Sequence, residues 1–94
     1  MIRQTVYFSG RVQGVGFRYM AVRIAQRYVV GGYVRNLKDG RVELVAEGTA
    51  DQVHSLVQDI ADHATKFVVE RAVDQSEATG EFGTPCAGAL QVRY

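Results

Sequence analysis

The chain has 94 residues, of which 47% are hydrophobic and 22% are charged. This length suits one small core, so we expect residues 1–94 to form a single domain. No apolar run approaches the ~20 residues of a membrane-spanning helix, and residues 1–20 lack the apolar segment of a signal peptide. The single cysteine, Cys86, cannot close an intramolecular disulfide. We therefore expect a cytoplasmic protein with no membrane partner.

Basic residues are concentrated in the first part of the chain. Through Arg41 there are eight Lys or Arg residues and one acid, Asp39, whereas residues 42–94 contain three basic residues and nine acids. The first part should therefore attract anions. Nucleic acid, a phosphorylated small molecule or a plain solvated surface would each fit this asymmetry, so the motifs must decide among them.

Hydrophobic periodicity divides the chain into strands and helices. Alternation with period two predicts strands, and apolar residues spaced i, i+3, i+4 predict helices that bury one face. Thr49 followed by Gln52 has the pattern of a capping box, and Asp39-Gly40 suits a hairpin turn. The prediction is strands over 2–10, 34–37, 41–47, 66–73 and 90–94, a helix over 17–28 ended by Gly31 and Gly32, a second helix after Thr49 with its apolar stripe over 53–64, and a loop over 74–88.

This order is βαββαβ with a short C-terminal strand added. Parallel crossovers are right-handed and both helices must bury their apolar stripes, so the order predicts an antiparallel sheet with two helices on one face. The expected fold class is thus α+β, a ferredoxin-like sandwich. A fold of this kind hosts many functions, and the function must be argued from a site.

A glycine-containing turn leads from the first strand into the first helix. Gly14 and Gly16 can adopt positive φ, so successive backbone N–H groups can converge on one anion at the positive end of the helix. Arg18 follows in the first helical turn, where its guanidinium could hold two phosphate oxygens. The segment lacks the Gly-Lys-Ser/Thr of a Walker loop, and Tyr19 replaces the third glycine of a dinucleotide fingerprint. The simpler alternative is a tight connection with an exposed arginine.

Asn36 is the only asparagine of the chain and lies at the end of a predicted strand. Its simplest role is to form the adjacent turn. In the expected sandwich this strand end could also lie near the glycine-containing turn, where an amide could orient a water molecule toward bound phosphorus. Asn36 is therefore a candidate catalytic residue.

Two segments carry a resemblance to a known family. Gly10-x-Val12-Gln13-Gly14-Val15-x-Phe17-Arg18, followed by Gly32-Tyr33-Val34-Arg35-Asn36-x-x-x-Gly40-x-Val42 and Gly48, resembles the two sequence signatures of the acylphosphatases. The match covers residues 8–48, while residues 65–88 show little similarity and Phe8 replaces a usual aliphatic residue. The resemblance implies a ferredoxin-like enzyme that hydrolyses small acyl phosphates, such as acetyl or carbamoyl phosphate, to a carboxylate and inorganic phosphate.

The resemblance also implies roles for individual residues. Arg18 would bind the phosphate and Asn36 would place the attacking water, without metal or cofactor. The expected partners are the acyl phosphate and inorganic phosphate, with no nucleic acid, and the protein is expected to be a monomer. Asp39 is assigned to the turn, because a carboxylate base would be repelled by the phosphate. The phosphate-binding loop would comprise Gln13, Gly14, Val15, Gly16, Phe17 and Arg18.

Two alternatives remain open at this point. One is an RNA-binding ferredoxin-like domain, because residues 14–19 faintly resemble an aromatic RNA-recognition motif; however, Phe17 begins a helix instead of lying on a central strand. The other is a noncatalytic module that binds phosphate or carbamoyl phosphate, of the kind found in larger carbamoyl-transfer proteins. His54 and His63 lack metal-ligand spacing and are expected at the surface.

Overall fold

The computed structural model describes residues 1–14 and 16–93. Within this part of the chain the elements follow one another in the predicted alternation of strands and helices. Their bounds are β1 Ile2–Gly10, α1 Phe17–Ala25, β2 Val29–Asn36, β3 Val42–Gly48, α2 Ala50–His63, β4 Val68–Glu77, β5 Cys86–Ala87 and β6 Ala89–Arg93.

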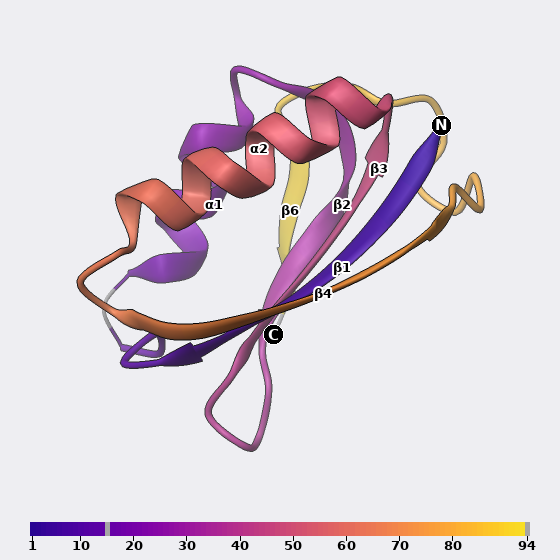
Figure 1. The fold of residues 1–94 in the computed structure, drawn as a ribbon. Helices are drawn as coiled ribbons and strands as arrows, with labels where there is room; N and C mark the ends of the chain where they lie inside the picture. Colours follow the sequence, from indigo (N-terminus) through magenta and orange to yellow (C-terminus); the bar gives the residue numbers. More distant parts are fainter. Residues whose placement is uncertain (15, 94) are drawn as a thin grey trace.

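The strands form one twisted sheet with both helices on the same face (Figure 1). The strand order is β4-β1-β3-β2, and β5 and β6 both pair with the outer edge of β2. β1 is antiparallel to β3 and β4, β2 is antiparallel to β3, and β6 is parallel to β2. This arrangement confirms the prediction of an α+β ferredoxin-like sandwich.

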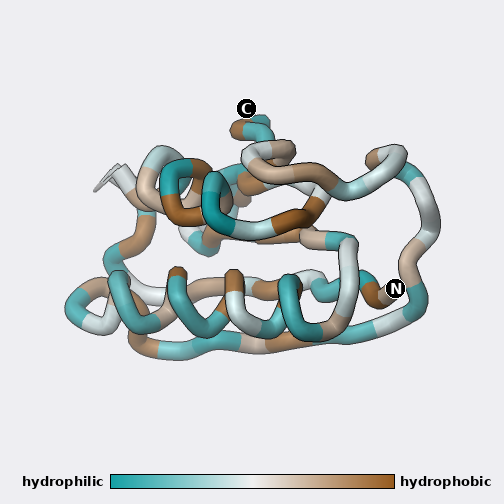
Figure 2. Tube along the Cα trace, turned by 90° about the horizontal axis from the view of Figure 1, so that it is seen from above, coloured by the Kyte–Doolittle hydropathy of each residue, from teal (hydrophilic) through white to brown (hydrophobic). Residues whose placement is uncertain are grey.

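The core lies between the helices and the covered face of the sheet. Along both helices each turn contains hydrophobic and hydrophilic residues (Figure 2), as expected for helices that bury a single face. Phe17 packs against Phe8 with the ring centroids 5.0 Å apart, which anchors the start of α1 on β1. The buried apolar residues of the helices are Phe17, Ala21, Ile24 and Ala25 in α1 and Val53, Leu56, Val57 and Ile60 in α2.

The start of α2 confirms the cap predicted at Thr49. Its hydroxyl accepts a hydrogen bond from the backbone N–H of Gln52 at 3.4 Å. The Gln52 side chain does not return to Thr49 but accepts from the backbone N–H of Val29 at 2.8 Å. Residue Gln52 therefore connects the helix start to the start of β2. None of the helices in the described part of the chain is long and apolar enough to cross a membrane.

The predicted end of the first helix is wrong. Helix α1 stops at Ala25, not at residue 28, and Gly31 and Gly32 lie inside β2, which begins at Val29 and ends at Asn36. Gly32 is explained by a close approach between strands: a Cβ on Gly32 would lie 1.8 Å from the carbonyl oxygen of Val45. Glycine at this position is required by strand packing, whereas the sequence pattern alone resembled a helix terminator.

The predicted loop over residues 74–88 is also partly wrong. Strand β4 continues to Glu77 and pairs with β1 along its length, and Cys86–Ala87 forms the short strand β5. β4 is an edge strand exposed on both faces, so its polar residues carry no alternating hydrophobic signal. The last strand is Ala89–Arg93, and the predicted terminal residue, Tyr94, lies outside the described residues.

Glu47 of β3 holds the chain segment that follows β4, at Thr79 and Gly80, against the sheet. Its carboxylate accepts hydrogen bonds from the backbone N–H and hydroxyl of Thr79, both at 2.8 Å, from the N–H of Gly80 at 3.1 Å and from Arg3 at 3.1 Å. Burial favours the neutral acid, but these donors outweigh it and hold the pKa of Glu47 below its ordinary value. The ionised carboxylate therefore stabilises the fold.

We expect Glu47→Gln to lower the free energy of unfolding by about 1.5–3 kcal/mol at pH 7, the range for a hydrogen bond to a charged group. Because the folded pKa lies below the ordinary value of 4.5, this stabilisation is present above pH 4.5 and is lost as the pH falls through the folded pKa. Urea unfolding at pH 7 and pH 3 measures both effects, with Glu70→Gln on exposed β4 as the control. An equal difference between wild type and variant at both pH values would contradict the assignment.

Candidate active site

The carboxyl ends of three strands, β1, β2 and β6, lie at the same end of the sheet. Phe8 of β1 and Asn36 of β2 both pair with Val42 of β3, which places them in one row across the sheet. β1 and β2 are thus parallel to each other, and β6 runs parallel to β2 with Arg93 beside Arg35. The loop that follows β1 and the end of β2 are therefore neighbours, as the sequence predicted.

The loop between β1 and α1 contains two glycines with the positive φ that the sequence predicted. Gly14 has φ 78° and Gly16 has φ 76°, both in the left-handed region, and Gly16 is the N-cap of α1. The buried side chain of Val12 anchors the loop in the core. The first N–H groups of a helix lack carbonyl partners within that helix and carry a partial positive charge. The predicted ligand Val15 lies outside the described residues.

A cleft of about 250 Å³ opens at these strand ends. Arg18 and Asn36, predicted from separate motifs, both line it. The side chain of Phe17 is buried in the core, which leaves its backbone amide as the group that could contact an anion. The remaining lining residues are Val12, Gly14, Gly16, Phe17 and Tyr19.

The C-terminal strand contacts Arg18 directly. The Nη1 group of Arg18 donates a hydrogen bond to the main-chain carbonyl of Arg93 at 3.3 Å. The guanidinium of Arg93 in turn lies 4.1 Å from the ring centroid of Tyr33, within the range of a cation–π interaction. No sequence motif points to Arg93, because a contact through a main-chain carbonyl leaves no residue-type signal.

An ion pair between the buried Glu43 and the exposed Arg35 stabilises the strand end that carries Asn36. Glu43 accepts hydrogen bonds from Arg35 at 2.7 Å and from the hydroxyl of Tyr33 at 3.1 Å. Burial opposes ionisation of Glu43, yet the donors prevail and hold the pKa of its carboxyl below the ordinary value. Since Arg35 and Glu43 face each other across β2 and β3, this pair holds the register one residue before Asn36.

Gln13 uses its side chain in a way that its sequence position did not predict. Its amide nitrogen donates to the carbonyl of Leu37 at 2.7 Å and to the carbonyl of Arg41 at 3.0 Å. Gln13 is not among the residues that line the cleft. Because its side-chain nitrogen is engaged by the β2–β3 hairpin, only its backbone is left for the expected contact with phosphate.

Asp39 forms the turn of this hairpin. Its carboxylate accepts from the backbone N–H of Arg41 at 3.1 Å and from the Arg41 guanidinium at 2.8 Å. The backbone and side-chain hydrogen bonds of Arg41 lower the pKa of Asp39 below its ordinary value. Asp39 is absent from the lining of the cleft, in keeping with its predicted role in the turn.

For the acyl phosphate hydrolysis that the two motifs imply, we expect Asp39→Ala to retain kcat/KM within about twofold, because Asp39 is an exposed turn residue that does not line the cleft. Steady-state kinetics with the variant shown to be folded by circular dichroism measures this. Loss of turnover in the folded variant would assign the carboxylate to the chemistry.

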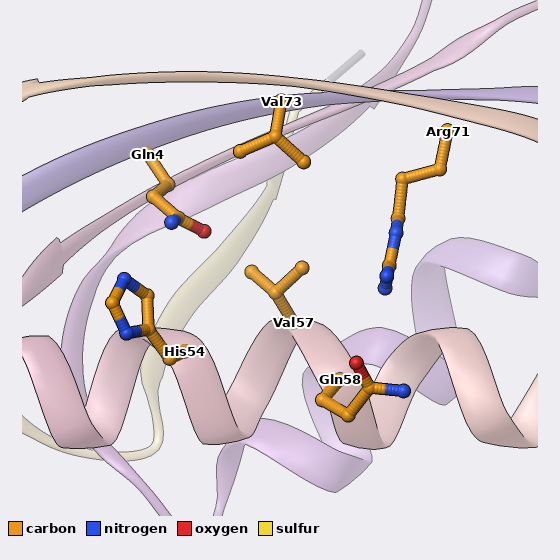
Figure 3. A pocket seen from close by; sticks show the side chains of 6 residues that line it. All are labelled: Gln4, His54, Val57, Gln58, Arg71 and Val73. Carbon is orange, nitrogen blue, oxygen red and sulfur yellow. The ribbon is translucent and has the colours of Figure 1, made fainter.

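The other polar groups singled out in the sequence lie elsewhere. His54 and His63 are exposed on α2, with His54 Nε2 3.0 Å from Gln75 and His63 Nδ1 3.0 Å from Asp59. A second concavity of about 210 Å³ lies between α2 and strands β1 and β4. Figure 3 shows His54 beside it and Arg71 reaching toward it from the sheet. In the part of the chain that the structure describes, no three His, Cys, Asp or Glu side chains gather as metal ligands.

Comparison with known proteins shows the family of the chain. The acylphosphatase family model matches residues 4–83. An acylphosphatase of Paenarthrobacter aurescens is 48% identical over 82 residues, covering 86% of this chain and 87% of that protein, and one of Chloroflexus aurantiacus is 44% identical over 84 residues, covering 88% and 91%. The match to an acylphosphatase of Bifidobacterium longum, 49% identical, spans 65% of this chain and 63% of that protein. The chain belongs to the acylphosphatase family.

Solved structures extend the similarity to the whole chain. The crystal structure of acylphosphatase from Bacillus subtilis is 30% identical and superimposes with a TM-score of 0.82, covering 100% of both chains. The structure of HypF from T. kodakarensis is 26% identical with a TM-score of 0.77, and the match covers 100% of this chain but 12% of that one. The same fold therefore occurs both as a whole acylphosphatase chain and as a small part of a larger protein.

Proposed function

We propose that the protein hydrolyses the carboxyl-phosphate anhydride of small acyl phosphates to a carboxylate and inorganic phosphate, with no metal ion required. The observation that carries this proposal is the convergence of Arg18 and Asn36 on one cleft beside the left-handed glycines of the β1–α1 loop. Membership in the acylphosphatase family supports the same reaction.

Phosphate recognition is assigned to the loop and to Arg18. A planar guanidinium can hold two oxygens of a phosphoryl group, while backbone N–H groups from residues 13–18 hold the others. These donors would stabilise the charge on the equatorial oxygens during transfer.

Water placement is assigned to Asn36. Its side-chain carbonyl can accept a hydrogen bond from water while its amide group donates to a neighbouring acceptor, which orients the water toward phosphorus. A carboxylate leaves readily without protonation, and a loose phosphoryl-transfer transition state requires mainly positioning and charge stabilisation. We assign the water's proton to a phosphate oxygen or to solvent, since Asp39 is engaged in the hairpin turn.

A second candidate is a noncatalytic module that binds phosphate or carbamoyl phosphate. Its support is the superposition on a small part of the larger HypF chain from T. kodakarensis. The RNA-binding alternative has less support, because Phe17 is buried at the start of α1 and offers no exposed ring for base stacking. The assignments of one domain over residues 1–94, a monomer without nucleic-acid partners and a cytoplasmic location are also part of the proposal.

The test is hydrolysis of acetyl phosphate by the purified wild-type protein in the presence of EDTA. Released inorganic phosphate is measured. We expect rapid turnover that EDTA does not reduce. Phosphate binding without turnover would favour the noncatalytic module. Salt-dependent affinity for single-stranded RNA, with no turnover, would favour the RNA-binding alternative.

A further inference from the structure

The side-chain amide of Gln13 joins the phosphate loop to the hairpin that follows Asn36. One nitrogen, Nε2, donates to two carbonyls, Leu37 at 2.7 Å and Arg41 at 3.0 Å, which lie 24 and 28 residues away in the sequence. A primary amide nitrogen has two hydrogens, so both contacts can be full hydrogen bonds. They form a bridge between segments that are covalently distant.

The two carbonyls belong to the mouth of the β2–β3 hairpin. The N–H of Leu37 donates to the carbonyl of Arg41 at 2.8 Å, and the N–H of Gly40 donates to the carbonyl of Leu37 at 3.2 Å. Each carbonyl has two lone pairs, and Gln13 uses the second one. Because Leu37 directly follows Asn36, a displacement of the hairpin relative to the loop would also displace Asn36.

We propose that Gln13 is a positioning residue that sets the distance between the phosphate-binding loop and Asn36. This inference rests on the proposed function, because it concerns the relative placement of bound phosphorus and attacking water. The loop backbone would hold the phosphoryl group, and the Gln13 side chain would hold the water-placing residue in line with it. A substitution far from the reacting atoms that displaces a reacting group by 1 Å can lower a rate by about 10²-fold.

The chemistry of glutamine fits this bridge better than that of related residues. A glutamate carboxylate has no proton to donate and would be repelled by the two carbonyl oxygens. Asparagine has the same amide but is one methylene shorter. Leucine has a similar shape but no polar group. These differences allow the hydrogen bonds, the reach and the packing of Gln13 to be tested separately.

The experiment compares Gln13→Leu and Gln13→Asn with wild type in the hydrolysis of acetyl phosphate, measuring kcat, KM and the inhibition constant of inorganic phosphate. The control is Gln4→Leu, because the Gln4 amide also donates a hydrogen bond between segments, to Gln75 at 2.8 Å, but lies outside the cleft. We expect both Gln13 variants to lower kcat by at least about tenfold, with the phosphate inhibition constant within about threefold of wild type. The control should retain wild-type kcat.

A double-mutant cycle with Asn36→Ala separates positioning from a general loss of structure. If Gln13 acts through Asn36, Gln13→Leu should lower kcat by less than about twofold in the Asn36→Ala background. Full additivity of the two losses, or wild-type kcat in both folded Gln13 variants, would overturn the proposal. Should Gln13→Leu fail to fold, Gln13→Asn carries the same cycle.

A readout independent of turnover distinguishes failure of this inference from failure of the proposed function. Amide hydrogen exchange of Leu37 and Gly40, followed by NMR, should be faster in the Gln13 variants than in wild type, because the carbonyls that organise the hairpin lose a partner. If wild type does not hydrolyse acetyl phosphate, the proposed function fails. Unchanged exchange in the variants would then overturn the bridge itself.

Discussion

Replacement of Arg18 by alanine should weaken phosphate binding and turnover together. Arg18 lines the cleft from the first turn of α1. Hydrogen bonds to charged groups contribute about 1.5–3 kcal/mol each, so the loss of a two-point contact predicts a decrease in kcat/KM of roughly 10²- to 10⁴-fold. Steady-state kinetics with acetyl phosphate and inhibition by inorganic phosphate measure the two effects.

The matched control for this variant is Arg23→Ala. Arg23 is an exposed arginine on the same helix that does not line the cleft, so its loss changes the charge of α1 without removing a phosphate ligand. We expect near wild-type kinetics from it. Arg18→Lys retains the charge but loses the planar two-point geometry, and an intermediate loss is expected. If Arg18→Ala and Arg23→Ala had equal effects, general attraction by the basic surface would replace specific binding.

The sequence predicted the proximity of Arg18 and Asn36 better than it predicted the element boundaries. Arg18 and Asn36 come from separate motifs, but each motif lies at the carboxyl end of a strand, and the parallel relation of β1 and β2 brings those ends to one edge. The βαββαβ order was sufficient to predict that these two strand ends lie near each other. Positive φ at Gly14 and Gly16 followed from the residue type.

The missed features depend on contacts between distant segments. The placement of Gly32 inside β2 results from its close approach to Val45, and the length of β4 results from backbone pairing with β1. Neither contact leaves a periodic signal in the local sequence. The bridge from Gln13 to Leu37 and the contact of Arg18 with Arg93 use main-chain carbonyls, which every residue has. Such contacts become visible only when the fold is known.

Replacement of Asn36 by alanine should have a different kinetic signature from replacement of Arg18. The proposed partner of the Asn36 amide is the attacking water, so its loss removes an interaction needed for reaction but not for binding of phosphate. Loss of one well-placed hydrogen-bonding group of this kind costs about 2.7–4 kcal/mol. We therefore expect kcat to fall by roughly 10²- to 10³-fold, while the inhibition constant of inorganic phosphate stays within about threefold of wild type.

Gln91→Ala provides the comparison for the Asn36 variant. Gln91 carries an exposed amide on β6, the strand adjacent to β2, but does not line the cleft. Its kcat and phosphate inhibition should both match wild type. Equal weakening of phosphate binding in Asn36→Ala and Arg18→Ala would contradict the division of roles, because it would make Asn36 a phosphate ligand. A selective loss of kcat instead assigns phosphate binding to the β1–α1 loop and water placement to the end of β2.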